Sequence, residues 1–473
     1  MNPLKKLASQ TAVYGLSSIV GRFLNYLLVP LHTRIFDKAD FGVVTELYAY
    51  VTFLIILLTY GMETSFFNFS RKENNSPAVY STALISLLTS SLTFMLMFCM
   101  FSGPIAQLLN YTDHPEYVIY FSLIIGLDAI TAVPFARLRQ QNKATQFALI
   151  KLVGIGVNIL LNILFLLIFP KWGYYSEQVG VGYIFIANLA SSIFVLLLLL
   201  PQFNIKPEFD KSLWKKMMRY GFPILLAGLP GMVNETLDRV VMKYLLPEGA
   251  DKLASLGVYG ACYKLSMLMT IFIQAYRFAA EPFFFSEKSD DAVRKNLARS
   301  THYFAIVCLL IFLGIVFYID IVKLFIDERY YEGLSIVPIL LFANFCLGLY
   351  INLSMWFKLS QKTIFGIYFS LFGAVITVLL NLILIPKIGY AGGAWATLAC
   401  YVSMLVLCYL IGQKYFPVHY DVFSFGLYVV MALILYFVSN YLHLNMFVNT
   451  FLLLLFVGVV ILKERKLLRH KNI

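Results

Sequence analysis

The chain has little charge. Of its 473 residues only 13% are charged, whereas 60% are hydrophobic. This composition excludes an ordinary soluble globular protein and is typical of a polytopic membrane protein. The net charge of +12 does not indicate nucleic-acid binding, because the basic residues lie at the ends of apolar segments. We therefore expect no nucleic-acid partner.

The sequence also lacks the signatures of an enzyme. Its six histidines are scattered without HExxH or similar metal spacing, and its six cysteines fall inside apolar segments without ligand spacing. There is no phosphate-binding P-loop, and no connector is long enough to fold as a catalytic domain. We expect no catalytic residues, no metal and no cofactor, and we expect that the protein is not an enzyme.

Long apolar segments are abundant. Segments long enough to cross a bilayer recur about fourteen times, from residues 9–31 to residues 446–462, with short connectors between them. They are continuously apolar rather than alternating, which favours helices over membrane strands. The sequence thus predicts an all-α polytopic membrane protein with about fourteen transmembrane helices.

Lys and Arg are distributed unevenly between alternate connectors. If the N-terminus is cytoplasmic, the inner connectors hold most of these residues, including Lys215, Lys216 and Arg219, and the outer connectors hold few. This positive-inside pattern predicts that both termini are cytoplasmic. The basic tail after Leu462 is expected to rest on anionic lipid.

The chain contains an internal repeat. Residues 143–162 align without gaps on residues 362–381, an offset of 219 positions. Earlier in the chain, the Phe-Gly-Val sequence around Gly42 answers the Leu-Gly-Val sequence around Gly257. Six helices per copy make both copies enter the membrane in the same direction. The repeat predicts two parallel six-helix lobes followed by two further helices.

The predicted domain boundaries follow from this repeat. The N-lobe, with helices one to six, covers residues 1–200, and a polar, basic cytoplasmic linker covers residues 201–219. The C-lobe, with helices seven to twelve, covers residues 220–412. Residues 413–473 hold helices thirteen and fourteen and the basic cytoplasmic tail.

The first apolar segment carries a cation near its middle. Arg22 shares one helical face with Ser18 and Asn25, because these residues are three or four positions apart. A cation at mid-membrane costs roughly 3 kcal/mol by insertion scales, so this face should meet water, a counter-charge or an anionic ligand. A structural ion pair is the alternative. We favour a wet cavity in which Arg22, Ser18 and Asn25 contact an anionic substrate.

Further charges lie inside later predicted helices. Arg239 and the deeper Lys264 are additional candidates for substrate contact, with an interfacial ion pair as an equal alternative for Arg239. Glu235, Arg239 and Lys243 are four positions apart along one face. This spacing suits internal ion pairing along the helix.

Three carboxylates inside predicted helices are candidates for ion coupling. Asp128 is the first choice, followed by Glu63 and Glu235. The chain has no nucleotide site, so directional transport would depend on a proton or sodium gradient or on consumption of the product. Each carboxylate could instead form a structural pair with a nearby Lys or Arg.

Several short segments together resemble one known family. The Tyr-Gly sequence ending at Gly15, Arg22, the Val-Pro-Leu-His-Thr-Arg sequence of residues 29–34 and the Asp-Phe-Gly sequence ending at Gly42 are similar to the start of polysaccharide and oligosaccharide flippases. The Glu-Thr-Leu-Asp-Arg sequence of residues 235–239 matches in the second half. These flippases belong to the multidrug/oligosaccharidyl-lipid/polysaccharide exporter superfamily. The resemblance covers helices one to twelve.

The resemblance implies a function. Members of the family flip undecaprenyl-pyrophosphate-linked oligosaccharides from the cytoplasmic to the outer leaflet of a bacterial inner membrane, by alternating access, for surface polysaccharide biosynthesis. Two lobes enclose a central, often cationic cavity, and a pyrophosphate is the anion that Arg22 would bind. Coupling to H+ or Na+ is a further implication. We expect a monomer and leave open an association with polysaccharide polymerase machinery.

Two other functions stay open. An ion-coupled drug or cation antiporter of the same superfamily would share the architecture, but it would favour acidic over basic cavity residues. A membrane glycan polymerase or ligase would usually carry a long outer loop, which this sequence lacks.

Overall fold

The computed structural model of the chain describes residues 15–17, 19–72, 76–286 and 289–470. Within these residues the regular structure is entirely helical, without a strand. The prediction of an all-α membrane protein is therefore confirmed. Twelve helices or runs of successive helices in the described ranges are long and apolar enough to cross a membrane.

Two predicted spans are not among these twelve. The first, residues 9–31, begins outside the described residues; residues 19–26 are helical and are followed by a turn and by α2 (Val29–Ile35). The seventh, residues 217–246, corresponds to α11 (Lys211–Leu245), a continuous helix whose internal prolines and polar residues lower its hydropathy. The described residues thus hold twelve candidate spans, and helices also lie in the described parts of the two other predicted spans.

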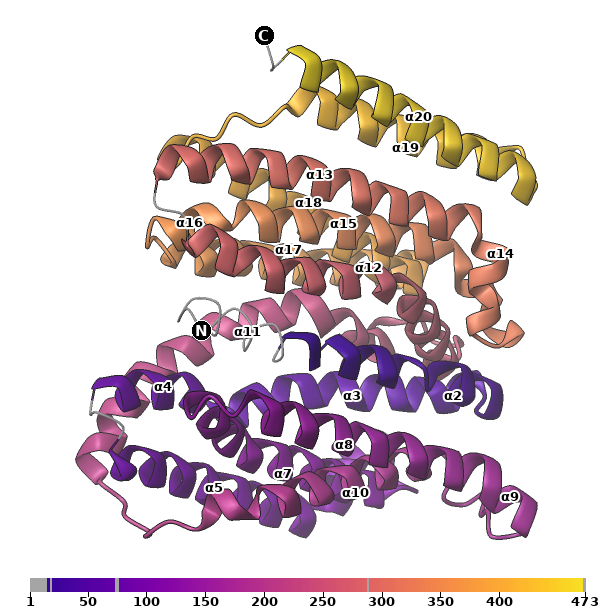
Figure 1. Cartoon of the computed structure of the whole chain (residues 1–473). Coiled ribbons are helices and arrows are strands. Elements are labelled where there is room, and N and C mark those ends of the chain that lie inside the picture. Colours follow the sequence, from indigo (N-terminus) through magenta and orange to yellow (C-terminus); the bar gives the residue numbers. More distant parts are fainter. Residues whose placement is uncertain (1–14, 18, 73–75, 287–288, 471–473) are drawn as a thin grey trace. The chain divides into compact units, whose positions relative to one another are not determined.

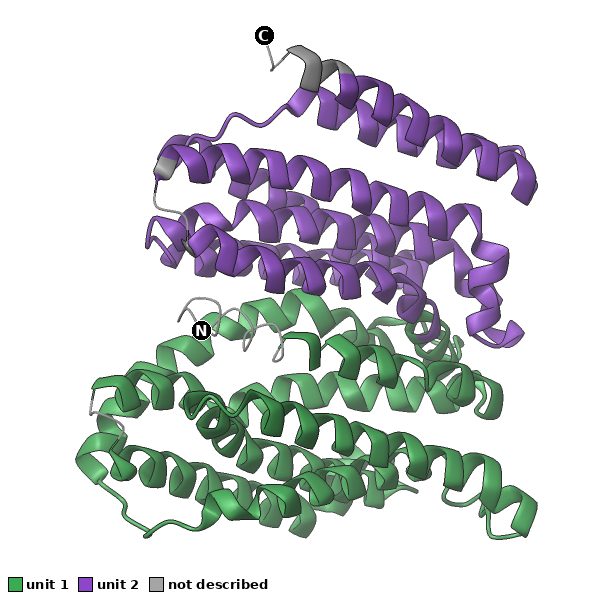
Figure 2. Cartoon of the chain, in the orientation of Figure 1, with its two compact units in different colours: residues 1–260 green, residues 261–473 purple. Residues whose placement is uncertain are grey.

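The chain divides into two compact units, residues 1–260 and residues 261–473 (Figure 2). Besides the first helix and α2, unit 1 holds the following helices (Figure 1): α3 (Lys38–Thr59), α4 (Met62–Lys72), α5 (Pro77–Met100), α6 (Ser102–Leu108), α7 (Pro115–Gln140), α8 (Ala144–Ile163), η1 (Leu164–Ile168), α9 (Phe169–Trp172), α10 (Gly182–Leu199), η2 (Leu200–Phe203) and α11. The predicted lobes were defined by the sequence repeat rather than by compactness, so their boundaries differ from those of the two units and stay a prediction.

Helix α12 (Lys252–Ser286) begins in unit 1 and continues into unit 2. The remaining helices of unit 2 are α13 (Asp290–Phe317), α14 (Ile319–Val322), η3 (Lys323–Phe325), η4 (Glu328–Ile336), α15 (Val337–Leu353), α16 (Met355–Leu359), α17 (Ile364–Ile388), α18 (Tyr390–Tyr415), α19 (Val422–Tyr441) and α20 (Met446–His470).

The second predicted span, residues 41–69, is broken between α3 and α4. Tyr60 and Gly61 both have positive φ, +33° and +70°, which is a left-handed conformation that favours glycine. A Cβ on Gly61 would lie 2.5 Å from the carbonyl oxygen of Gly221 in α11. The break and the missing side chain therefore allow α11 to approach the backbone at this point.

Two hydrophobic clusters form the core of unit 1. In the first, Phe185 of α10 packs edge-on against Phe121 and Tyr117 of α7, with ring centroids 4.7 and 5.2 Å apart. In the second, Met62 of α4 and Met217 of α11 are buried beside residues of α5 and α7. Helix α11 thus packs its apolar face against other helices of unit 1.

The predicted linker, residues 201–219, is helical in its second half. Asp210 caps α11 by accepting hydrogen bonds from the backbone N–H groups of Ser212 and Leu213. The first half is held against α5, where Tyr80 Oη donates to the carbonyl of Gln202 at 3.0 Å. The linker is therefore fixed to unit 1 by hydrogen bonds.

Unit 2 has an aromatic core of its own. Trp356 of α16 is 2% exposed and packs against Phe365 and Phe369 of α17, with ring centroids 5.2 and 6.5 Å apart. Cys408 of α18 is buried in the same cluster. Buried cysteine here acts as a small apolar side chain.

Candidate anion-binding cavity in unit 1

Unit 1 contains a cavity of about 720 Å³. The first helix, α3, α4, α7, α8 and α10 all contribute to its wall. The lining residues include both charges and amides: Ser17, Gly21, Arg22, Asn25, Ile55, Thr59, Glu63, Asp128, Thr131, Ala132, Phe135, Arg139, Phe147, Lys151, Gly154, Ile155, Asn158, Asn188, Ser191, Ser192 and Val195. A volume of this order suits a small-molecule or headgroup site.

Arg22 lies at this cavity, as the polar face of the first segment predicts. Its side chain is exposed, and it forms no hydrogen bond or ion pair with any residue that the structure describes. Asn25, one turn further on, also lines the cavity, whereas Phe23 and Leu27 are exposed on other faces. Ser18 lies outside the described residues.

Lys151 of α8 is a second cation at the cavity, and it was not among the predicted site residues. Its Nζ lies 4.2 Å from the centroid of the Phe135 ring, a cation–π contact. Within the described chain it forms no ion pair. The available signal was a single lysine inside an otherwise apolar segment, the pattern that marks Arg22.

Two predicted coupling carboxylates lie at the same cavity. Asp128 of α7 is exposed to it and accepts a hydrogen bond from Ser192 Oγ at 2.9 Å. Glu63 of α4 forms an ion pair with Arg139. Arg22, Arg139 and Lys151 therefore face two carboxylates, which leaves the cavity with a positive surplus.

A chain of polar side chains reaches Asn25 from the interior of unit 1. His32 Nε2 lies 2.8 Å from Asn162 Oδ1, and Asn162 Nδ2 donates to Asn158 Oδ1 at 3.1 Å. Asn158 Nδ2 in turn lies 3.4 Å from Asn25 Oδ1. Such connected amides orient one another, so Asn25 and Asn158 present polar groups to the cavity in a defined arrangement.

The other predicted substrate contacts lie elsewhere. Arg239 of α11 is close to Asp238, with Nε 3.4 Å from Oδ1, and donates to the carbonyl of Glu235. Glu235 itself is exposed and does not line the cavity. Lys264 belongs to unit 2, in the part of α12 after residue 260.

The predicted ion pairing along one face of helix seven is wrong for Lys243. Its Nζ lies 3.2 Å from Oε2 of Glu46 in α3. The spacing along α11 could not reveal a partner that lies 197 positions away in the sequence. A tertiary contact has replaced the local one.

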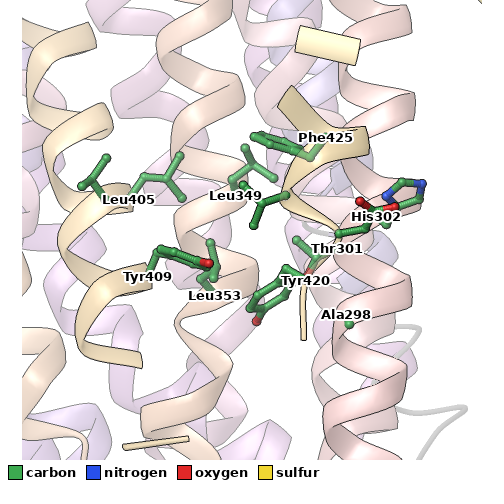
Figure 3. A pocket seen from close by; sticks show the side chains of 12 residues that line it. Ala298, Thr301, His302, Leu349, Leu353, Leu405, Tyr409, Tyr420 and Phe425 are labelled. Carbon is green, nitrogen blue, oxygen red and sulfur yellow. The ribbon is translucent and has the colours of Figure 1, made fainter. Parts of the chain in front are cut away.

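Unit 2 contains a pocket of different character, with a volume of about 230 Å³. Figure 3 shows Leu349, Leu405 and Phe425 around it, on α15, α18 and α19. His302 at its edge is engaged, because its Nε2 lies 2.8 Å from Glu464 Oε1. The described residues that line it include neither Lys nor Arg, so this pocket does not suit an anion.

The described residues contain no group of His, Cys, Asp or Glu side chains that could hold a metal ion. The chemistry of the unit 1 cavity is therefore that of guanidinium, ammonium, carboxylate, amide and hydroxyl groups. Two accessible cations beside polar amides can bind an anion that carries hydroxyl groups.

The chain matches the family described as "Polysaccharide biosynthesis protein" over residues 7–288. It is 21% identical over 414 residues to an uncharacterized membrane protein of Methanocaldococcus jannaschii, covering 83% of this chain and 94% of that protein.

Solved structures share the fold. The lipid II flippase MurJ in an inward closed conformation has a TM-score of 0.74 at 14% identity, covering 97% of this chain and 99% of MurJ. An inward-facing multidrug resistance MATE family transporter of the MOP superfamily has a TM-score of 0.67 at 15% identity, covering 85% and 94% of the two chains. These relatives are a flippase and a transporter, not enzymes.

Proposed function

Because the chain belongs to the family of polysaccharide biosynthesis proteins, we propose that it flips a lipid-linked oligosaccharide across the membrane. The substrate class is an undecaprenyl-pyrophosphate-linked saccharide, moved from the cytoplasmic to the outer leaflet of a bacterial inner membrane by alternating access. The family match and the fold shared with a lipid II flippase support this class of function. The Lys and Arg asymmetry supports cytoplasmic termini.

The observation that carries the proposal is the pair of accessible cations in unit 1. Arg22 and Lys151 line one cavity, and in the described residues neither is neutralised by an ion pair. A charge within a membrane span that forms no ion pair is costly unless it serves a ligand or a water-filled cavity. A pyrophosphate would neutralise both cations, and the guanidinium of Arg22 can hold two of its oxygens at once.

The neighbouring polar groups suit the rest of a saccharide headgroup. Asn25, Asn158 and Asn188 supply amides, and Ser191 and Ser192 supply hydroxyls at the cavity wall. Amides and hydroxyls both donate and accept hydrogen bonds. The first sugar next to the phosphate would find partners here. Arg239 and Lys264 are assigned later contacts along the substrate's path.

Asp128 is the proposed coupling carboxylate. It lies at the same cavity as Arg22 and Lys151, so an anion and a proton or sodium ion would sense each other's charge there. Glu63 is already paired with Arg139, and Glu235 lies outside the cavity; they are the second and third choices. Antiport would then exchange a proton or sodium ion for the lipid-linked anion.

A drug or cation antiporter is the second candidate, because Asp128 also offers an acceptor for a cation in this cavity. The positive surplus there opposes it, since a cationic drug would approach Arg22 and Lys151 as well. The protein is proposed to act as a monomer that can associate with polymerase machinery, with its basic C-terminal tail on anionic lipid.

The test is a flipping assay in proteoliposomes with a fluorescent undecaprenyl-pyrophosphate-linked saccharide and, in parallel, a cationic dye. We expect flipping of the lipid and no transport of the dye. Arg22→Ala should remove flipping, and Arg22→Lys should restore it only in part, because Lys cannot make the bidentate contact.

Lys143→Ala is the matched control, since Lys143 is an exposed cation at the N-terminus of α8 and does not line the cavity. It should leave flipping unchanged. If Arg22→Ala flips the lipid normally at normal protein levels, Arg22 does not bind the headgroup. Transport of the dye alone would favour the antiporter.

A further inference from the structure

A buried ion pair joins α11 to α3. Lys243 and Glu46 have side chains that are 8% and 0% exposed, with Nζ 3.2 Å from Oε2. Lys243 Nζ also donates to the carbonyl of Leu109 at 2.7 Å, and Tyr111 Oη donates to Glu46 Oε2 at 2.5 Å. Tyr50 Oη donates to the other carboxylate oxygen at 2.9 Å. Both charges are therefore fully engaged in the interior of unit 1.

Beside this pair, α3 and the first turns of α12 cross in backbone contact. A Cβ on Gly42 would lie 1.9 Å from the carbonyl oxygen of Leu253, and a Cβ on Gly257 would lie 1.8 Å from the carbonyl oxygen of Lys38. Gly42 and Gly257 are equivalent positions of the internal repeat. Leu253 lies four residues before Gly257, and Lys38 lies four residues before Gly42. The two copies of the repeat thus meet symmetrically here, and only glycine permits the approach.

Glu46 lies one turn after Gly42 on α3, so the ion pair and the crossing are on successive turns. One turn further along α12, a Cβ on Gly260 would lie 2.3 Å from Oγ1 of Thr45. Thr45 directly precedes Glu46. The contact of α3 with Gly260 and its contact with Lys243 are therefore made by adjacent residues, which links the packing of α12 on α3 to the ion pair.

We propose that the Lys243–Glu46 pair and the Gly42–Gly257 crossing form a latch that closes the ends of α3, α11 and α12 and must open during each transport cycle. The charge asymmetry of the connectors assigns these ends to the outer side. The inference rests on the proposed alternating-access function.

The latch has two distinct states for a physical reason. When it is closed, each charge has its counter-charge and every polar group around it is engaged. When it opens, water replaces these partners, so that both states are satisfied while a partly open state leaves charges buried and unpaired. Close-packed helices with a glycine crossing behave in the same way, because they fit in contact or not at all.

Cysteine labelling tests the latch without any substrate. In a chain whose native cysteines are replaced, Leu256→Cys reports on the crossing, because Leu256 is 0% exposed in α12. A membrane-impermeant maleimide added from outside should label it slowly. In Lys243→Ala the closed state holds an unpaired Glu46, so labelling should become roughly tenfold faster or more.

Two further variants keep the result decisive. Glu46→Gln combined with Lys243→Met removes both charges and should return labelling to the slow rate even if Lys243→Ala folds poorly. Lys358→Ala breaks the half-exposed Lys358–Glu281 pair of unit 2 and should leave labelling unchanged. Met62→Cys, at a 1% exposed position of unit 1, should stay protected in every variant.

The latch is overturned if Lys243→Ala leaves the labelling of Leu256→Cys slow, or if Met62→Cys becomes accessible in parallel, which would indicate general loosening. Because maleimide labelling needs no lipid-linked saccharide, a failure of the flipping assay would refute the proposed substrate and leave this result standing. The two ideas therefore fail in different experiments.

Discussion

The two copies of one repeated helix have taken on different chemistry. Helix α8 in unit 1 and α17 in unit 2 contain most of the aligned residues 143–162 and 362–381. The first copy places Lys151 and Asn158 at a wet, charged cavity, whereas the aligned positions of the second copy are Ser370 and Thr377. The pocket in unit 2 is apolar. The helix is common to both copies, but its side chains at these positions differ in chemistry.

Asn162 and Asn381 are equivalent residues at the end of the repeat, and their contacts also differ. Asn162 Oδ1 lies 2.8 Å from His32 Nε2 and belongs to the amide chain that reaches the cavity. Asn381, its counterpart, has a buried Oδ1 with no hydrogen-bond partner in the described part of the chain. Its Nδ2 donates to the carbonyl of Thr377. An asparagine in the same place thus serves a polar network in one unit and a local helix contact in the other.

The most destabilising exchange between the two copies is expected when the second copy receives the charge of the first. Ser370 lies within α17 and interacts with Tyr350 of α15. In Ser370→Lys the ammonium would meet the interior of unit 2 without the cavity that receives Lys151. We expect a loss of about 3 kcal/mol in membrane stability, seen as a lower unfolding temperature and a lower yield of folded protein.

The converse control for that variant is Ser370→Ala, which should change the unfolding temperature little. A fully stable Ser370→Lys protein that also flips the lipid faster would contradict the contrast between the units. It would mean that unit 2 can accept a cation as readily as unit 1.

The reciprocal exchange, Lys151→Ser, gives the first copy the chemistry of the second. We expect flipping of the fluorescent lipid to fall by roughly tenfold or more, because one of the two cations that face the headgroup is gone. Stability should change little, since in the described structure Lys151 forms no ion pair and loses only its contact with the Phe135 ring. Lys143→Ser provides the matched loss of charge at an exposed position of the same helix. Equal flipping in both variants would show that Lys151 does not contact the substrate.

The sequence was enough to predict the helical fold and the twelve spans that the described structure shows, because apolar length and periodicity are local properties. It also predicted the face of Arg22 and Asn25, since helical spacing places them together. It could not show that Lys151 shares their cavity, because this depends on how α8 packs against the first helix.

For the same reason the sequence could not find the partner of Lys243. Glu46 lies in another helix, and only the packing of α11 on α3 brings the two charges together. Local spacing suggested Glu235 and Arg239 instead. The assignment of Arg239 and Lys264 to substrate contact depends on similar long-range information, and it stays a prediction.

The smallest expected effect comes from comparing one ion pair in unit 1 with one ion pair in unit 2. Arg139–Glu63 in unit 1 lines the cavity, whereas Lys358–Glu281 in unit 2 is half-exposed and has its Nζ 2.6 Å from Oε1. An exposed pair of this kind contributes about 0–1 kcal/mol. Glu281→Gln should therefore change the unfolding temperature slightly and leave flipping unchanged. Glu63→Gln should cost equally little stability, yet it releases Arg139 as a third accessible cation and should alter how flipping depends on a pH or sodium gradient. If both variants flip alike under every gradient, the charge balance of the unit 1 cavity has no part in transport, and the difference between the two units is structural alone.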